Sequence, residues 1–360
     1  MVTPALDVRL SALGDQSVLG DRWQGLEARS QASFFLGWTW MGAWLASTGV
    51  RPELLSVQGE GQDIALALIG RGMARRLLGK AATLYLNQSG HGPADRSFIE
   101  YNGLLMADDA PDGVEAAVMT QLFARNDWRV LRLAGMLPDA LLAAAGRFHR
   151  RMIVVQSPAY FVDLDAVRAA EGNYLSLLSA NSRSQIRRSM REYGEDDLKV
   201  TRASTMAEAD DWLAEMAVLN AGRHADNAWD EPLFRAFARE LVSRGLENDE
   251  VELLRMKQGG HSLGYLLNVV YRGRAMNYQS AFAPGLSSKA KPGLMCHGAA
   301  VARYADMGCG LYSLLAGDDQ YKQSLSTGHD VLQWWNLERF SPMLEIEHLL
   351  RLIFRRPVSA

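Results

Sequence analysis

The chain has 360 residues, of which 48% are hydrophobic and 22% charged, a balance typical of a folded globular protein and not of a disordered or fibrous one. Its 38 basic and 41 acidic side chains give a formal net charge of −3, so no overall field draws it to nucleic acid or to an anionic membrane. Cys296 and Cys309 form neither a metal-binding pattern nor a disulfide framework, which favours a reducing compartment. Since the sequence shows no secretory signal pattern and no run of about 18 apolar residues, we expect a cytoplasmic protein with no metal and no nucleic-acid partner.

At about 100–200 residues per domain the length predicts two domains, and the first half mixes helices with strands. Residues 33–47 carry apolar and aromatic side chains on most faces, as a helix packed into a core does. Beyond them the patterns predict paired strands at 63–71 and 82–88, helices at 112–127 and 138–150, and strands at 128–135 and 152–164.

The second half repeats this order at greater length. The patterns predict a helical stretch at 173–194, a strand at 198–203, helices at 206–223 and 232–244, strands at 250–258, 261–273 and 274–282, a helix at 294–307 and a strand at 311–317. Both halves contain the order strand, strand, loop, helix, strand, and the segments VLRLAG and YSLLAG each follow a helix and end at a glycine. The sequence therefore predicts an α/β (α+β) protein of two related units, each a mixed β-sheet flanked by helices.

The loop GLSSKAKPGLM, from Gly285 to Met295, leads directly into the helix at 294–307. The first amides of a helix have no intrahelical partner and carry the positive end of the helix dipole, so this end can bind a phosphate group. The alternative is an ordinary surface loop that turns at Pro-Gly, since glycine-rich loops before helices are common.

The segment from Tyr271 to Leu325 resembles the C-terminal part of the CelD-like acetyltransferase family of the GNAT superfamily, which is related to the Fem aminoacyl transferases. The shared features are a tyrosine-containing hairpin, a Pro-Gly helix start, a helix that ends in Gly, and a strand that ends in Gly-Asp before a Tyr-Lys pair. The basic helix SANSRSQIRRSMREYG and, more loosely, the aromatic residues of 33–47 also resemble the family. The resemblance implies tandem GNAT-like units, with an N-terminal unit at 1–160, a C-terminal acyltransferase domain at 161–340 and an amphipathic helix at 341–360.

By this resemblance the segment 289–294 occupies the place of the pyrophosphate loop of the superfamily. The expected cofactor-binding residues are Lys289, Lys291, Gly293 and Leu294, and the co-substrate is acetyl-CoA or another acyl-CoA. The usual Arg or Gln followed by Gly-x-Gly or Gly-x-Ala is absent, so the sequence leaves an acyl carrier protein or an aminoacyl-tRNA open as the donor.

The segment LLAGDDQYKQSL follows the strand at 311–317 with Asp318, Asp319, Tyr321 and Lys322. A strand end can present polar groups to a cleft, and Gly317 permits a sharp exit. Lys322 is a candidate to stabilise an oxyanion or a phosphate, Tyr321 to carry a proton, and Asp319 to position an amine or act as a base. In the alternative interpretation Asp318 caps a short helix, Tyr321 packs and Lys322 is solvated; for Asp318 we expect the cap.

Further candidates for substrate binding come from three places. Arg183, Arg187 and Arg191 recur at i, i+4 and i+8 and line one face of a helix; such a row is usually a solvated face, but in the resembled family it implies contact with an anionic substrate, and we assign Arg183 and Arg187. His297, one turn into the helix at 294–307, is either packed or a catalytic base. His224, Tyr278 and Gln279 are expected to border the substrate.

The expected function is therefore an N-acyltransferase that moves an acetyl or longer acyl group from acyl-CoA to an amine of a sugar, lipid or cell-envelope or exopolysaccharide precursor. The alternatives are a Fem-like transferase that uses aminoacyl-tRNA and a non-catalytic scaffold in polysaccharide export. The C-terminal SPMLEIEHLLRLIFRRP reads as an amphipathic helix that packs on the protein or, with its arginines, contacts a membrane surface.

Overall fold

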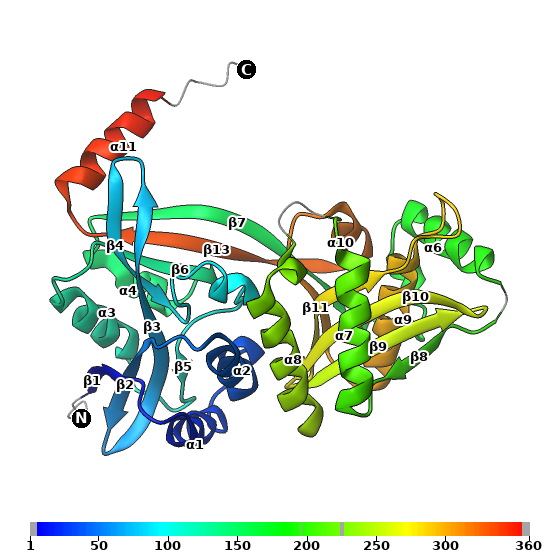
Figure 1. Ribbon diagram of the computed structural model, residues 1–360, viewed down its shortest axis with the longest axis horizontal. Coiled ribbons are helices and arrows are strands. Elements are labelled where there is room, and N and C mark those ends of the chain that lie inside the picture. The colour runs from blue at the N-terminus through cyan, green and yellow to red at the C-terminus, as the bar shows by residue number, and fades with distance from the viewer. Residues whose placement is uncertain (1–5, 195, 224–226, 355–360) are drawn as a thin grey trace. The chain divides into compact units, whose positions relative to one another are not determined.

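The computed structural model describes residues 6–194, 196–223 and 227–354, and it divides into two compact units (Figure 1). Unit 1 comprises Met1–Leu45, Gly49–Gln156 and Leu332–Ala360, and unit 2 comprises Ala46–Thr48 and Ser157–Val331. The first division lies close to the expected boundary at residue 160. Residues 332–360 are grouped with unit 1, and the expected domains at 1–160, 161–340 and 341–360 stay predictions.

The sheet of unit 1 has the strand order β1-β2-β3-β4-β6-β13, with β5 paired to β3. All these pairs are antiparallel except β4–β6, which is parallel. The strands are β1 (Asp7–Ala12), β2 (Glu53–Gly59), β3 (Gln62–Arg76), β4 (Gly79–Leu86), β5 (Leu105–Met106), β6 (Val130–Met136) and β13 (Gly328–Glu338). The predicted strands at 63–71 and 82–88 are thus one long hairpin that turns at Leu77 and Leu78, and the segment between them belongs to its arms.

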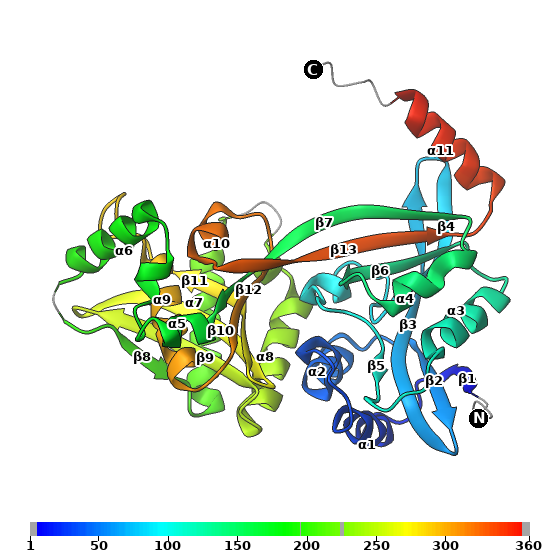
Figure 2. The ribbon, with the colours of Figure 1, turned by 180° about the vertical axis from the view of Figure 1, so that it is seen from behind.

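The helices of unit 1 lie on both sides of its sheet (Figure 2). They are α1 (Gln16–Glu27), α2 (Trp38–Thr48), α3 (Val114–Ala124), α4 (Ala140–Ala144) and α11 (Pro342–Phe354), with short 3-10 turns at Phe34–Leu36, Ala94–Ser97 and Ala145–Arg147. Apolar residues of α3 and α4 pack with those of β2, β3, β4 and β6 into one core. The tryptophans of 33–47 are largely in the interior, as expected, since Trp40 and Trp44 are buried.

The sheet of unit 2 has the strand order β7-β12-β11-β10-β9-β8. Here too one pair, β11–β12, is parallel and the others are antiparallel. The strands are β7 (Arg150–Asp163), β8 (Lys199–Arg202), β9 (Val251–Gln258), β10 (His261–Tyr271), β11 (Arg274–Phe282) and β12 (Leu311–Ala316). The prediction of an α/β fold with mixed sheets flanked by helices is therefore confirmed.

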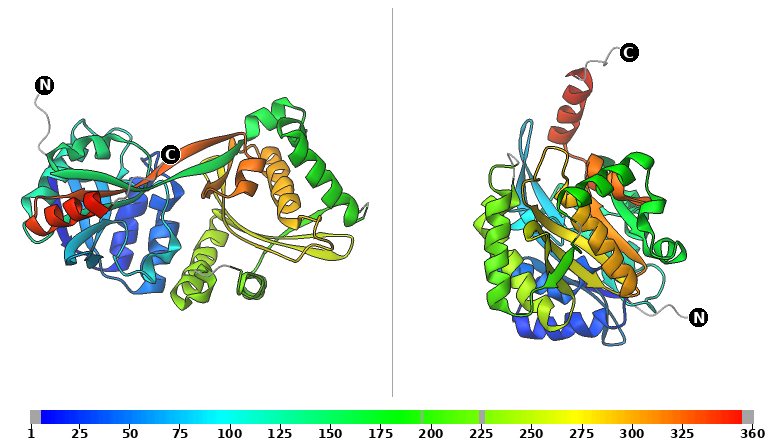
Figure 3. Two further views of the ribbon diagram at one scale, coloured as in Figure 1. Left: turned by 90° about the horizontal axis from the view of Figure 1, so that it is seen from above. Right: turned by 90° about the vertical axis from the view of Figure 1, so that its right-hand side faces the viewer.

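The helices of unit 2 cover the two faces of this sheet (Figure 3). They are α5 (Leu164–Ala169), α6 (Ala180–Glu192), α7 (Met206–Asn220), α8 (Pro232–Glu247), α9 (Pro292–Asp306) and α10 (Gln320–Leu325), with 3-10 turns at Tyr174–Leu177 and Ala228–Asp230. On one face, residues of α5, α6, α9 and the strands form a hydrophobic core, which includes Leu266 of β10. On the other face Trp212 of α7 packs against Tyr265, the neighbour of Leu266.

Several elements differ from the sequence prediction: β1, α1 and β2 were not predicted, and the helix expected at 138–150 is limited to Ala140–Ala144 and a 3-10 turn. The helical stretch expected at 173–194 is interrupted, because Ser179 is in an extended conformation and caps α6 by accepting the Ser182 N–H. The strand β13 was not predicted, and its pairing with β6 is what brings the end of the chain into unit 1. No helix among the described residues is long and apolar enough to cross a membrane.

Candidate active site

The strands β11 and β12 are paired over only three residues and then separate. Arg274, Ala275 and Met276 lie opposite Leu311, Tyr312 and Ser313, after which β12 continues with β7 and β11 continues with β10. Tyr278 is an extra residue in β11, because Leu267 and Asn268 pair with Gln279 and Asn277 on either side of it. Such bulges redirect strands and are frequent beside active sites. The polar groups of the site are found on α9 and α10, which adjoin the ends of β11 and β12.

The helix α9 begins against the end of β11. Gly293 lies so close to Phe282 that an added Cβ would be 2.9 Å from the ring. The N-cap residue Lys291 provides no side-chain hydrogen bond to the first turn, although its carbonyl accepts from Leu294 N at 3.1 Å. The Gly293 amide and the helix dipole therefore form a positive end with two exposed lysines, Lys289 and Lys291, in the preceding loop. Such a positive helix start is suited to bind a pyrophosphate group. The binding role of these residues stays a prediction.

The basic helix α6 is fastened to this loop. Ser189 Oγ accepts from Lys291 N at 3.0 Å, and Ser287 Oγ donates to Glu192 Oε2 at 2.6 Å. Arg183 is half-buried and its guanidinium donates to the Leu178 carbonyl at 2.6 Å, so it stabilises the start of α6. Arg187, in contrast, is exposed on the same helix. The positive charges of α6 and of the loop before α9 thus belong to one connected part of unit 2.

His297 is the centre of an aromatic cluster. It is 1% exposed, and its Nδ1 lies 2.9 Å from the Tyr312 hydroxyl. Its ring stacks on Tyr321, with centroids 5.8 Å apart and planes inclined by 21°, and lies 5.7 Å from the ring of Phe282. Burial, together with the charge of Lys322, lowers the pKa of His297 to about 3. The imidazole is therefore neutral near pH 7, and its buried Nε2 has no hydrogen-bond partner within the described part of the chain.

Lys322 is buried, with 9% of its surface exposed, and is not a solvated residue. Its Nζ donates to the Ala316 carbonyl at 2.6 Å and lies 3.9 Å from a carboxylate oxygen of Asp319. Gly317 has φ +142°, and the position of a Cβ there would be 2.7 Å from the same Nζ. Glycine is therefore needed at this strand exit both for its backbone conformation and to make room for the ammonium group.

The expected cap by Asp318 is wrong. The N-cap residue of α10 is Asp319, and its side chain makes no capping hydrogen bond. Because α10 starts one residue later than a cap at Asp318 requires, the Asp319 carboxylate is directed to Lys322 instead. Asp318 is exposed beside it.

The other ionisable groups near the site are held in their neutral forms. Tyr321 is 37% exposed, and burial of the phenol, reinforced by Asp319, raises its pKa above the ordinary value. Cys296 is completely buried, and burial raises the pKa of its thiol. A thiol kept protonated in this way is a poor nucleophile, so the surroundings of Cys296 favour direct transfer over a cysteine intermediate.

The remaining predicted residues lie elsewhere or outside the description. Tyr278 is buried and packs against Phe234 and Phe237 of α8. Gln279 accepts a hydrogen bond from the indole of Trp229 at 3.1 Å. His224 lies outside the described residues.

Sequence reasoning missed a buried polar network behind the site. Glu252 of β9 accepts from Arg303 at 2.5 and 3.0 Å and from the Tyr304 hydroxyl at 2.9 Å, and Tyr304 in turn accepts from Asn268 at 2.9 Å. The signal was available as a carboxylate and an amide inside the apolar runs VELL and YLLNVV. These bonds fix α9 on β9 and β10, and through α9 they position His297 and Gly293.

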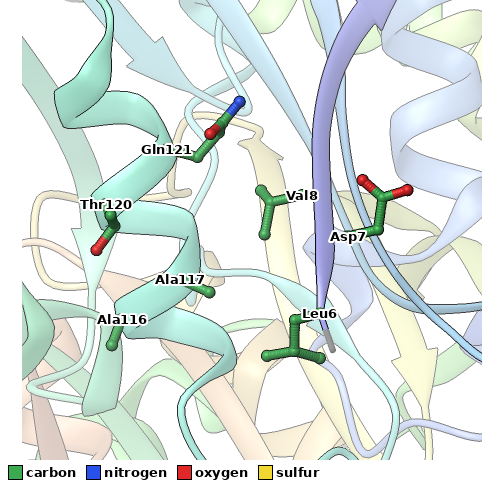
Figure 4. A pocket seen from close by; sticks show the side chains of 7 residues that line it. All are labelled: Leu6, Asp7, Val8, Ala116, Ala117, Thr120 and Gln121. Carbon is green, nitrogen blue, oxygen red and sulfur yellow. The ribbon is translucent and has the colours of Figure 1, made fainter. Parts of the chain in front are cut away.

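A further hollow of unit 1 lies between β1 and α3 (Figure 4). Its lining contains one carboxylate, Asp7, beside small or neutral side chains, and we assign it no chemistry. Among residues 6–194, 196–223 and 227–354, no three His, Cys, Asp or Glu side chains gather in a way that could hold a metal ion.

Comparison with known proteins places this part of the chain among acetyltransferase domains. Residues 180–323 match the family model described as an acetyltransferase (GNAT) domain, a range that contains every predicted site residue. No curated protein matches the chain.

Three solved structures share the fold of most of the chain. FemX is 9% identical, with 96% of this chain and 100% of FemX covered at a TM-score of 0.55. The C-terminal domain of a putative lysylphosphatidylglycerol synthetase from Agrobacterium fabrum is 12% identical, with 94% and 97% covered at a TM-score of 0.55. The L-PGS structure from Bacillus licheniformis is 9% identical, with 93% and 97% covered at a TM-score of 0.54. At such identities these matches establish the fold alone. Residues 180–323 of unit 2 are thus similar to GNAT acetyltransferase domains, in agreement with the resemblance seen in the sequence.

Proposed function

We propose that the protein is an N-acyltransferase that moves an acetyl or longer acyl group from acyl-CoA to an amine of a sugar, lipid or cell-envelope or exopolysaccharide precursor. The observation that carries the proposal is the combination found in unit 2. The positive start of α9 lies beside exposed lysines, and the same helix carries His297, which contacts Tyr321 of α10. A diphosphate and a reacting thioester need these two surroundings next to each other.

In the proposed reaction the amine nitrogen forms a bond to the thioester carbonyl carbon while the carbon–sulfur bond breaks. The amine loses a proton, for which the exposed Asp319 carboxylate is the proposed acceptor. The departing thiolate takes a proton, and the Tyr321 phenol, which is protonated because its pKa is raised, is the proposed donor. The Lys322 ammonium supplies positive charge for the developing oxyanion. His297, neutral and buried, positions Tyr321 by stacking and is not the base.

The experiment that tests the donor is calorimetric titration of the protein with acetyl-CoA, longer acyl-CoAs and free coenzyme A. We expect saturable binding that is weakened in the double variant Lys289→Ala, Lys291→Ala. The matched control is Lys80→Ala, since Lys80 is an exposed lysine of unit 1. If no acyl-CoA binds the folded wild-type protein, the assignment of the donor is wrong.

A Fem-like transferase that uses aminoacyl-tRNA is the second candidate, and the similarity in fold to FemX favours it. A tRNA partner requires an extended basic surface, whereas the chain has a net charge of −3 and the exposed positive charge that we describe in unit 2 is local to α6 and the loop before α9. A gel-shift titration with charged tRNA separates the two candidates. A third, a non-catalytic scaffold in polysaccharide export, would be supported if the protein consumed no thioester in extracts and captured a stable partner.

We also propose that unit 1 contacts a membrane surface through α11 and the tip of the β3–β4 hairpin. The helix α11 lies beside the tip of the hairpin (Figure 1), and Arg76 of the hairpin pairs with Glu347 of α11 at 3.5 Å. Large apolar side chains project from both, with Ile353 73% exposed and Leu77 59% exposed, and Leu78, Ile346, Leu349 and Leu352 complete the set. Exposed Arg75, Lys80 and Arg351 beside them complement anionic lipid headgroups.

The proposed location is the cytoplasm. Cys296 and Cys309 are both free thiols, which a reducing compartment maintains, and the proposed acyl-CoA donor is a metabolite of that compartment.

A further inference from the structure

The two units repeat one arrangement of strands. In each, four antiparallel strands are followed by a parallel fifth strand and an antiparallel sixth: β1-β2-β3-β4-β6-β13 in unit 1 and β8-β9-β10-β11-β12-β7 in unit 2. In each, the fifth strand has a register shift against the sixth and a left-handed residue at that place, Gly135 with φ +63° and Leu315 with φ +59°. The separation of β11 and β12 that defines the candidate active site therefore has a counterpart in unit 1.

That counterpart is a pocket. β4 and β6 pair only from Thr83 to Tyr85 and from Val130 to Arg132, and then separate. At the point of separation lies a cavity of about 360 Å³, lined in part by residues of β4, β6 and β13. Val154 and Val155 of β7 also line it, and they precede Ser157, where unit 2 begins, so the whole lining belongs to unit 1. A volume of this size is in the range of small-molecule sites.

The pocket has aromatic walls. Trp334 and Trp335, neighbours on β13, both line it and are half-buried, but their side chains point to opposite faces of the sheet, and Trp335 packs against the core of unit 1. Trp334 therefore provides the indole face on the side of Arg132. The ring of Tyr85 forms a further aromatic surface and is held in place by Gly90, where an added Cβ would be 2.5 Å from the ring. Flat apolar faces at a half-open site stack well against the C–H faces of a ring-shaped ligand.

The pocket also has positive charge with free donors. Arg132 is exposed, and its guanidinium lies 5.9 Å from the centre of the Tyr85 ring. Arg132 Nε donates a hydrogen bond to Asn336 Oδ1 at 3.1 Å. Within the described residues, the two terminal amino groups of the guanidinium have no hydrogen-bond partner and are available to a ligand. Gln88 adds an amide group at the rim. A guanidinium with two available N–H edges is suited to bind a carboxylate or phosphate in a bidentate manner.

Hydrogen bonds of Asp95 fix the loop that forms the rim of the pocket. Asp95 accepts from Ser89 N at 2.7 Å, from Ser89 Oγ at 2.8 Å and from Gly90 N at 2.8 Å. The loop that carries Gln88 and Gly90 is therefore fixed without a ligand, and the carboxylate of Asp95 is occupied by these three bonds. A pocket that needs no rearrangement retains more of its contact energy as affinity.

We propose that this pocket of unit 1 binds a sugar that carries an anionic group, a uronate or a phosphate. The ring stacks on Trp334, the anion pairs with Arg132, and Gln88 binds ring hydroxyls. Glycan recognition by unit 1 is separate from acyl transfer by unit 2, and it deepens the proposed function only by naming the class of molecule that the enzyme holds. Since the site uses no residue of unit 2, its failure and the failure of the acyltransferase proposal are distinguishable.

The test is titration of the full-length protein with glucuronic acid, glucose 1-phosphate, glucose and inorganic phosphate. Binding is measured by tryptophan fluorescence and by calorimetry. We expect saturable binding of both anionic sugars and weaker binding of glucose and of phosphate. Arg132→Gln, which can still bond to Asn336, should weaken the anionic sugars by about tenfold or more and leave glucose unchanged. Trp334→Leu should weaken all three sugars. Comparison of the two anionic sugars tells which anion the site prefers.

Arg75→Gln is the matched control, because Arg75 is an exposed arginine of unit 1 outside the pocket. Lys322→Met, in unit 2, should bind the sugars as the wild type does. The proposal is overturned if none of the sugars binds the folded wild-type protein, if phosphate alone binds as tightly as the sugar phosphate, or if Arg132→Gln binds the anionic sugars normally. A circular dichroism spectrum of each variant establishes that it is folded.

Discussion

Replacement of Lys322 separates its structural from its chemical contribution. In Lys322→Met the apolar stem is kept and the ammonium group is lost, together with its 2.6 Å hydrogen bond to the Ala316 carbonyl and its 3.9 Å approach to Asp319. Gln323→Met is the matched control, because Gln323 is the next residue of α10 and is exposed.

The loss of stability follows from the burial of this ammonium group. A hydrogen bond to a charged group contributes about 1.5–3 kcal/mol, and Lys322 is only 9% exposed, so solvent replaces it poorly in the variant. For a unit of this size a loss of that order lowers the melting temperature by roughly 3–12 °C. The control should change it by less than about 2 °C, since exposed positions tolerate such substitutions.

The loss of activity should exceed what instability explains. If the ammonium stabilises the oxyanion, turnover at a temperature where the variant is fully folded falls by tens-fold or more, in line with about 2.7–4 kcal/mol for one oxyanion donor. Lys322→Arg should rescue poorly, because a planar guanidinium does not fit the place of a compact ammonium against Gly317. Differential scanning calorimetry and acyl-CoA turnover are measured on the same preparations. Wild-type turnover in folded Lys322→Met would refute the chemical role, and an unchanged melting temperature would refute the structural one.

Three further predictions concern His297, Gly293 and α11. The pKa of His297 is about 3 in the folded state, below the ordinary value of 6.5, so the unfolded state binds more protons and stability is lost as the pH falls below 6.5. The variant His297→Gln lacks this titration. Between pH 7.5 and 5 it should therefore lose about 2 kcal/mol less unfolding free energy than the wild type, measured by urea titration. Gly293→Ala should destabilise by about 1–3 kcal/mol through its clash with Phe282 and weaken acyl-CoA binding, whereas Gly298→Ala in the same helix, with nothing within 4 Å of the new methyl group, should do neither. Leu349→Gln with Ile353→Gln should abolish co-sedimentation with vesicles of phosphatidylglycerol and phosphatidylcholine without a change in melting temperature, and an unaffected double variant would exclude membrane contact through α11.

The sequence allowed most of the second unit to be predicted, because its elements have strong periodicity and clear ends. The hairpin of β10 and β11 turns at Arg272 and Gly273, as expected, and α9 starts at the predicted Pro-Gly. The pairing of β13 with β6 could not be predicted from the sequence. Its partner β6 is about 200 residues away in the chain, and no local pattern encodes such a pairing.

Three of the predicted site residues lie together in the structure, but the sequence did not predict their environments. Lys322, Tyr321 and His297 come together as one cluster. The sequence left open whether Lys322 acts in the site or is solvated, and it did not predict that the folded chain buries this lysine under the strand exit at Gly317. Tyr312 escaped notice because a tyrosine inside an apolar strand reads as core, and only the fold places its hydroxyl against His297. Burial and hydrogen-bond partners depend on tertiary packing, which residue type and spacing do not specify.

The repeated strand arrangement explains why each unit has polar groups where its two parallel strands separate. Where a parallel pair of strands separates, backbone pairing ends and side chains can converge on the gap without disturbing the ladder. In unit 2 the groups adjoining this place are His297, Tyr321 and Lys322, which suit charge stabilisation and proton transfer. In unit 1 they are Arg132 and Trp334, which suit recognition of an anionic ring. If both proposals hold, the duplicated fold uses one structural feature twice, for chemistry in one unit and for binding in the other. An exchange of roles, with acyl-CoA bound only by unit 1, would appear as loss of acyl-CoA affinity in Arg132→Gln and its retention in Gly293→Ala.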